Sequence, residues 1–296
     1  MRLGERNSSG HRYVRVIGVR LALLFAVFLP VAGCSQLSFI YGLAGSALED
    51  EAAFFLDLDE EDERLVDRKI DEFLAWHDAA MLPRYAQFMK AQADLVADDK
   101  VDRVAVTDAV EALRLMLDDL VRGAAPYVAE ILANHTTPDK LGHLERQMTE
   151  RLEERRSELA EPEDERLEAR IEKITDNLER FTGDLEDAQI SRIRLYATQT
   201  VGANKRWLDA RVNRQRAFLN FLAQEPSRAE ITSFLHKIVL HGHEIVDPAY
   251  QSVSKARWQL FNALLADIML SLSAEQRETM AETLRDYAAE LQALSG

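Results

Sequence analysis

The histidines near residue 240 come closest to a metal-ligand pattern. His241 and His243 flank a glycine, Glu244 follows them, and His236 lies upstream. Zinc sites use three or four ligands in a fixed geometry, supported by further hydrogen bonds. One His-x-His pair in a glycine-containing loop falls short of that set. His241 and His243 are the only metal candidates in the sequence, and we expect neither a metal nor another cofactor.

His77 is a second residue that could do chemistry, as a general acid or base. That role needs a carboxylate partner and a cleft that admits a substrate. Asp78 is adjacent, but the apolar spacing around Trp76 places His77 on the buried face of a helix, so we expect a core histidine. The sequence has no glycine-rich phosphate loop and no Gly-x-Ser-x-Gly motif. We therefore expect no catalytic residues and a protein that is not an enzyme.

Cys34 is the only cysteine, and its surroundings are the most specific signal in the chain. Five arginines and a single acid occupy the first 20 residues, and the apolar run 21–31 follows. That run is too short to cross a bilayer, which needs ~20 apolar residues. Basic residues, a short apolar segment and small residues together indicate a secretory signal peptide over residues 1–33. The alternative, a buried cysteine after a core helix, does not explain why the arginines lie on one flank.

The segment Val31-Ala-Gly33-Cys34 resembles the bacterial lipobox. The resemblance implies cleavage between Gly33 and Cys34, a diacylglycerol on the Cys34 sulfur, and a third acyl chain on the new amine. Several acyl chains anchor a protein firmly, because each buried methylene contributes ~0.8 kcal/mol. Ser35, rather than aspartate, follows the cysteine, which by the same resemblance favours the outer membrane over the inner one. We expect a lipid-anchored protein on the periplasmic side of the bacterial envelope.

The charge of the chain excludes some partners. Of the 36 basic and 51 acidic side chains, residues 1–33 hold five arginines and one glutamate, which leaves 31 against 50 and a net charge near −19. A nucleic-acid partner needs a basic face, so we expect no nucleic-acid binding. The same charge argues against wide contact with anionic lipid.

The chain beyond the anchor has the pattern of one all-α domain, residues 58–296, forming a bundle of roughly eight helices. Glycine and proline are scarce, and no long segment alternates with the period of a strand. Residues 34–57 form the lipidated N-terminus and tether, whose aromatic side chains either pack on the body, which we favour, or lie on the bilayer. Helix starts are indicated at Asp59, Thr107, Thr137 with Pro138, Ser227 with Glu230, and Ser273 with Gln276.

Residues 138–182 have narrow apolar stripes amid arginine and glutamate. Leu167, Ile171 and Ile174 begin a seam with alternating spacings of four and three. The turn at Pro162 would let this seam face the leucines of the preceding helix. The pattern predicts a charged antiparallel helical hairpin that protrudes from the body and serves contact with a partner.

Three segments place a leucine just before a helix start and an acceptor side chain shortly after it. They begin at Leu58, at Leu185 with Gln189, and at Leu272 with Gln276. Repeated capping chemistry explains the pattern. The alternative is kinship with periplasmic helical chaperones whose motif is Leu-Thr-x-x-Gln, which the segment from Leu272 resembles most, with Ser273 in place of threonine.

Four further segments carry a resemblance to a known family. They are Leu74-Ala-Trp-His-Asp78, Leu82-Pro-Arg-Tyr85, Asp139-Lys-Leu-Gly-His-Leu-Glu145 and Asp247-Pro-Ala-Tyr250. Together with the lipobox and the acidic helix start, they resemble a family of bacterial lipoproteins catalogued as domain of unknown function 6279, over nearly the whole mature chain. The family brings no known activity, so the resemblance implies only fold and location. The candidate interaction residues are Trp76, His77, Pro83, Arg84 and Tyr85.

These features predict a membrane-anchored, non-enzymatic scaffold or interaction protein of the envelope. Its partners would be the membrane, through the acyl chains on Cys34, and an unidentified envelope protein. The alternative is a holdase-like periplasmic chaperone, which would present a concave apolar or amphipathic surface.

Overall fold

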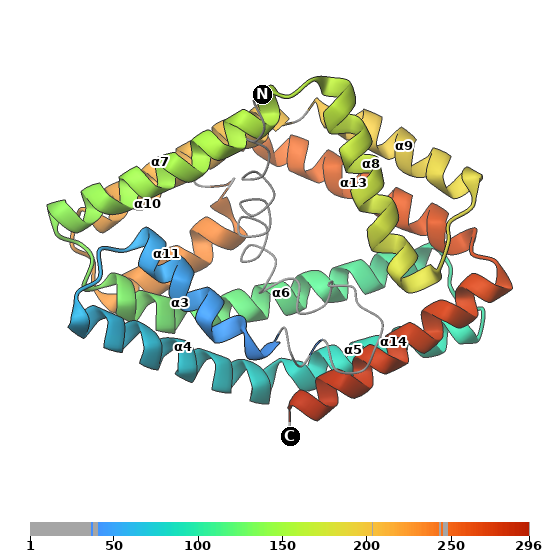
Figure 1. Ribbon diagram of the computed structural model, residues 1–296, viewed down its shortest axis with the longest axis horizontal. Coiled ribbons are helices and arrows are strands. Elements are labelled where there is room, and N and C mark those ends of the chain that lie inside the picture. Colours follow the sequence, from blue (N-terminus) through green and yellow to red (C-terminus); the bar gives the residue numbers. More distant parts are fainter. Residues whose placement is uncertain (1–36, 38–40, 203, 243, 245–247, 296) are drawn as a thin grey trace, which may run out of the picture.

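The structure, a computed structural model, describes residues 37, 41–202, 204–242, 244 and 248–295. These residues form helices and contain no strand, which confirms the all-α prediction (Figure 1). The helices are α3 (Ala44–Phe55), α4 (Glu60–Ala80), α5 (Leu82–Ala97), α6 (Arg103–Leu132), α7 (Pro138–Ala160), α8 (Glu163–Thr182), α9 (Asp187–Val201), α10 (Asn204–Leu222), α11 (Arg228–Leu240), α13 (Pro248–Leu270) and α14 (Ala274–Leu294).

Capping side chains fix where several helices begin, as their sequences predict. Asp59 caps α4 in a capping box with Asp62, and Ser227 and Ser273 do the same for α11 and α14. The prediction for α6 was wrong by four residues. Asp102 accepts a hydrogen bond from the Ala105 amide at 2.7 Å, so the helix starts at Arg103 and not at Thr107.

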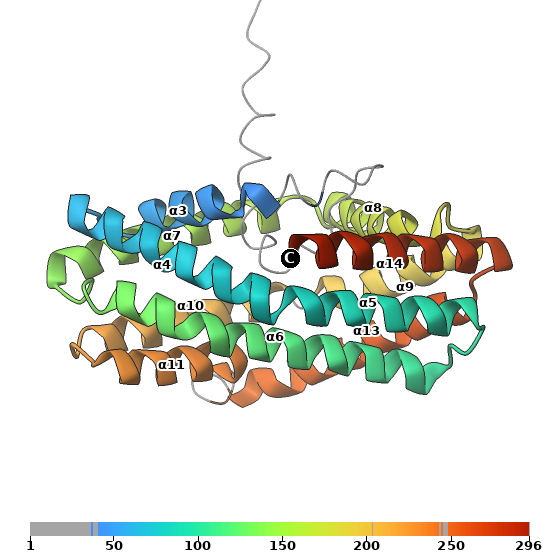
Figure 2. The same cartoon turned by 90° about the horizontal axis from the view of Figure 1, so that it is seen from below.

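The helices form a flat, elongated body, viewed on its broad face in Figure 1 and along its edge in Figure 2. α14 packs along α5, and α6 packs against α4, α11 and α13. α9 lies against α8 and α13, and α7 lies against α3 and α10. Helices that are distant in the sequence therefore pack side by side, as α5 and α14 do.

The buried side chains form three apolar clusters. The largest joins α4, α5, α6 and α14 around Leu82, Ala93 and Leu291. A second lies between α8, α9 and α13, and a third joins α6, α7, α10 and α11. Each cluster draws on helices from distant parts of the chain, so the described helices depend on one another for burial of their apolar faces.

The predicted protruding hairpin over 138–182 is wrong. α7 and α8 diverge from the turn at Pro162, as Figure 1 shows, and pack on different helices. Leu144 of α7 lies in the cluster with α10 and α11, whereas Ile171 of α8 lies in the cluster with α9 and α13. The reason is that each narrow stripe buries its leucines against apolar helices elsewhere in the chain, so the two stripes do not pair with each other.

The segment before α4 packs on the body, which is the arrangement that its aromatic residues favoured. α3 contacts α4 and α7. The Arg151 guanidinium of α7 lies 4.3 Å from the ring centroid of Phe54 and pairs with Glu51 at 3.0 Å. Leu37 is 6% exposed and belongs to the largest cluster. The described part of the predicted tether is therefore part of the fold.

Candidate functional site

The structure separates the five candidate interaction residues into buried and exposed ones. His77 and Tyr85 are buried in the largest cluster, and Trp76 is half-buried against it. Pro83 and Arg84 are exposed, and Arg84 pairs with Asp119 of α6 at 2.7 Å. The block Leu82 to Tyr85 thus joins α4, α5 and α6, and only Pro83 and Arg84 offer accessible surface.

His77 belongs to a half-buried polar chain in which the Tyr41 hydroxyl is the central group. Its Nδ1 atom is 2.8 Å from the Tyr41 hydroxyl, which donates its proton to Asp78. A hydroxyl has one proton, so Nδ1 must donate to the Tyr41 oxygen. Burial raises the pKa of Tyr41, and the hydrogen bond to Asp78 adds to that effect. Burial likewise raises the pKa of Tyr85 to about 12.

The surroundings of His77 confirm that it is a core histidine. The imidazole is 3% exposed and stacks on Tyr41 with 5.8 Å between ring centroids. The Phe73 and Tyr85 rings lie at 6.0 and 5.7 Å. A general acid or base must reach a substrate, and this ring is enclosed by aromatic side chains. The chain of hydrogen bonds therefore fixes the N-terminal segment to α4.

Protonation of His77 should make the protein less stable in mild acid. Burial lowers the pKa of His77 in the folded state, so the unfolded chain takes up a proton first as the pH falls below about 6.5. Between that pH and the lowered pKa, the free energy of unfolding should fall by about 1.4 kcal/mol per pH unit.

Urea unfolding at pH 7.5, 6.5 and 5.5 measures this slope. His77→Gln should flatten it, because glutamine has no group that titrates in this pH range. An equal slope in the wild type and the His77 variant would contradict the assignment.

Gly123 of α6 provides the space that Trp76 occupies. A Cβ atom at this position would overlap the indole ring of Trp76. Gly123→Ala should therefore lower the free energy of unfolding by about 1–3 kcal/mol, the cost of overpacking. Gly142→Ala in α7 is the matched control, since its nearest neighbour is the Arg146 guanidinium at 3.5 Å. That change should be neutral or stabilising, because alanine is the better helix former. Chemical denaturation measures the free energy of unfolding of both variants. Equal effects of the two substitutions would refute the prediction.

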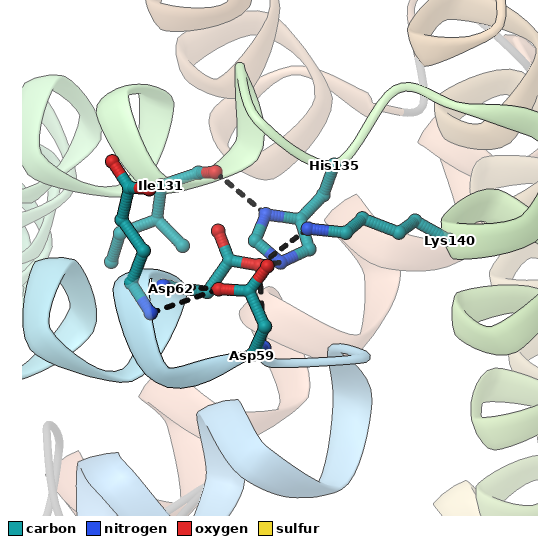
Figure 3. Close-up of polar contacts among 6 residues, drawn as sticks. Asp59, Asp62, Ile131, His135 and Lys140 are labelled. Atoms are coloured by element: carbon teal, nitrogen blue, oxygen red, sulfur yellow. Dashed lines mark hydrogen bonds and ion pairs between the residues drawn. The ribbon is translucent and has the colours of Figure 1, made fainter.

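A second buried polar cluster joins the start of α4 to the loop between α6 and α7 (Figure 3). Asp62 is 5% exposed, and its Oδ2 atom accepts a hydrogen bond from Lys140 of α7. His135 is 1% exposed and lies beside this carboxylate, with 3.6 Å between Nε2 and Oδ2. Its Nδ1 atom donates to the Ile131 carbonyl at 2.9 Å, which leaves Nε2 without a hydrogen-bond partner among the described residues.

The Asp62 cluster connects helix ends. Asp59 caps α4 and accepts from the Asp62 amide at 2.9 Å, and this backbone hydrogen bond lowers the pKa of Asp59. Lys140 lies 78 positions from Asp62. Sequence reasoning assigned Asp59 its capping role but missed the cluster, because no local pattern brings the three chain segments together.

The histidines near residue 240 do not converge among the described residues. His241 Nδ1 lies 3.7 Å from Glu244, and His236 points its Nε2 atom at the Arg122 carbonyl, 3.4 Å away. His243, Gly33 and Cys34 lie outside the described residues. Within the described part of the chain, no group of three or more histidine, cysteine or carboxylate side chains is placed to hold a metal ion.

Of the three segments in which a leucine precedes a helix start, those that begin at Leu185 and Leu272 contact each other. Gln189 and Gln276 are 2% and 6% exposed, and each side-chain amide donates to the other's carbonyl oxygen at 3.0 Å. Gln276 also donates to the Asp184 carbonyl at 2.8 Å. Leu185 and Leu272 both lie in the cluster between α8, α9 and α13. The glutamines thus close a capping box on their own helices and tie the two helix starts together.

An apolar cavity of about 190 Å³ lies between α5, α6, α8, α13 and α14. Met89, Met269 and Met280 contribute flexible side chains to its wall, and Phe181 and Ile268 contribute rigid ones. An engineered apolar cavity of about 150 Å³ binds benzene, so this volume accepts a small apolar group. No local pattern in the sequence indicates this cavity, because its wall comes from five helices.

The fold and these clusters define an all-α protein in which the buried clusters around Asp62 and Gln276 connect different helices. The chain belongs to the family of unknown function DUF6279, whose sequence model matches residues 54–241. The match supports the resemblance over more than half of the chain, although the segment from Asp247 to Tyr250 lies beyond it. No curated protein and no solved structure matches the chain. None of the described helices has the length and apolar composition needed to cross a bilayer.

Proposed function

We propose that this protein is a lipid-anchored, non-enzymatic interaction protein on the periplasmic side of the bacterial envelope, with the outer membrane favoured. The lipobox-like segment that ends at Cys34 supports the anchor. The burial of Leu37 in the largest cluster adds where the helical body would lie relative to the anchor. Only two residues lie between Leu37 and Cys34, and the three steps of the chain from Cys34 to Leu37 span at most about 11 Å. Acyl chains on Cys34 would therefore hold the helical body directly against the membrane surface.

Such close attachment suits a protein that presents a fixed face to a partner in the envelope. The body has a net negative charge, and exposed arginines and glutamates pair along α7, as Arg156 does with Glu153 at 2.5 Å. Paired surface charges of this kind contribute little to the free energy of unfolding. We therefore assign them to solubility and to contact with a partner protein.

Metabolic labelling with an alkyne palmitate tests the anchor. The wild type should carry the label and sediment with membranes, and its mature mass should lack residues 1–33. Cys34→Ala should lose the label, whereas Ser35→Ala should retain it. A mature wild-type protein that still contains residues 1–33, or unchanged labelling of Cys34→Ala, would refute the proposal. Crosslinking in cells and recovery of the labelled protein would then identify its partner.

The apolar cavity favours a second function, that of a holdase-like chaperone. A holdase must offer apolar surface to unfolded clients, and the wall of this cavity is apolar. Ala109 lines the cavity, whereas Ala79 is exposed on α4. A holdase should slow the thermal aggregation of citrate synthase, Ala109→Leu should weaken this effect, and Ala79→Leu should not. Aggregation that is unaltered by the wild type would exclude this function.

A further inference from the structure

A second cavity, of about 450 Å³, lies where α6, α10, α11 and α13 approach one another. The described residues on its wall include three cations, Arg114, Arg214 and Lys255, and no carboxylate. The whole chain has 51 acidic against 36 basic side chains, so a wall with cations alone runs against its composition. A concave surface lined by one sign of charge attracts ligands of the opposite sign.

Two of these cations have no partner among the described residues. Arg114 lies 3.5 Å from Glu111, but Arg214 and Lys255 form no hydrogen bond or ion pair with any described residue. Elsewhere in this acidic chain, Arg151, Arg155 and Arg194 all have glutamate partners. Arg214 and Lys255 therefore keep their hydrogen-bond donors available on one cavity wall.

The position of Arg214 is set by the turn after α11. A Cβ atom on Gly242 would lie 2.6 Å from the Arg214 Cδ atom, so the aliphatic stem of the arginine packs closely on this glycine. This contact restrains the stem of the Arg214 side chain, which lowers the conformational entropy that the side chain loses on binding a ligand.

The same wall carries exposed apolar side chains. Trp258 is 46% exposed and Val239 is exposed as well, and Tyr250 lies beside them on the cavity wall. An exposed indole next to guanidinium and ammonium groups offers a flat surface for a ring or an apolar group while the cations hold an oxyanion. The volume fits an organic molecule rather than a bare ion.

We propose that this cavity binds a phosphorylated organic ligand, with Arg214 and Lys255 on the phosphate and Trp258 against its organic part. Arginine matches phosphate through its planar set of donors, and lysine adds a point charge. A soluble phosphate ester and a phospholipid headgroup share this chemistry. The proposal does not depend on the anchor at Cys34, so the two can fail separately.

Calorimetric titration of the detergent-purified full-length protein tests the site with two probes, phenyl phosphate and monomeric dihexanoyl phosphatidic acid. At least one probe should bind. Arg214→Gln and Lys255→Gln should each weaken it about tenfold, the loss expected for a charge-assisted hydrogen bond. Lys90→Gln on α5 removes an equal charge from an exposed site elsewhere and should leave binding unaltered. Circular dichroism checks that the variants stay folded.

Each outcome of the titration either supports the proposed site or overturns it. Binding of phenyl phosphate alone supports a soluble ester as the ligand, and binding of the lipid alone supports a headgroup. Binding that the Arg214 and Lys255 variants leave unchanged, or that Lys90→Gln weakens equally, would show general electrostatic attraction and overturn the site. Failure of both probes to bind would overturn it too.

Discussion

Asp62→Ala is expected to lower the free energy of unfolding by about 2–4 kcal/mol. Removal of one partner from a buried ion pair leaves the other partner's charge without compensation. The side chains of Asp62 and Lys140 are 7% and 21% exposed, so water can relieve only part of this cost. The variant also loses the reverse bond of the capping box, from the Asp59 amide to Asp62 at 3.5 Å.

Urea denaturation measures the effect, with Asp67→Ala as the matched control. Asp67 lies on the same helix but is exposed, so its replacement should alter stability by no more than about 0.5 kcal/mol. Lys140→Met in the Asp62→Ala background should restore part of the loss, because it removes the unpaired ammonium group. A loss below about 1 kcal/mol for Asp62→Ala would show that the cluster does not stabilise the fold.

Gln276→Ala is the second substitution with a large expected effect, a loss of about 2–3 kcal/mol. It removes the donor to the Asp184 carbonyl and the acceptor of the Ser273 amide at 3.0 Å. It also leaves the buried amide of Gln189 with fewer partners. Gln292→Ala, at an exposed position of the same helix, should change stability little.

A double-mutant cycle tests whether the two glutamines act together. Gln189→Ala and Gln276→Ala each leave a buried amide short of hydrogen bonds, whereas the double variant removes both amides. The double variant should therefore lose about 1 kcal/mol less than the two single losses combined. Strict additivity would mean that each glutamine serves only its own helix.

Local sequence predicted several helix starts and the buried position of His77. The capping boxes of α4, α11 and α14 follow from residues at most three positions apart, and such short spacings can be read directly. The buried position of His77 follows from helical periodicity in the same way. The proposed anchor at Cys34 also depends on local order, since basic, apolar and small residues follow one another.

The proposed phosphate site and the apolar cavity could not be predicted, because each depends on helices brought together by folding. The cations of the site come from Arg114, Arg214 and Lys255, on three different helices. Each is an ordinary surface residue in its own helix. Only their common cavity, and the absence of carboxylates among the described residues of its wall, distinguishes them.

The sequence by itself determined that this protein is helical, where the capped helices α4, α11 and α14 begin, and which family it resembles. Tertiary structure decided which apolar stripes meet. α7 and α8 carry stripes that suggest a hairpin, yet they pack on different helices, because partners elsewhere in the chain bury their leucines. Capping acts within one helical turn, whereas the choice of packing partner depends on the apolar area that the whole chain can bury. The meeting of Asp62 with Lys140, and of Gln189 with Gln276, follows from that choice.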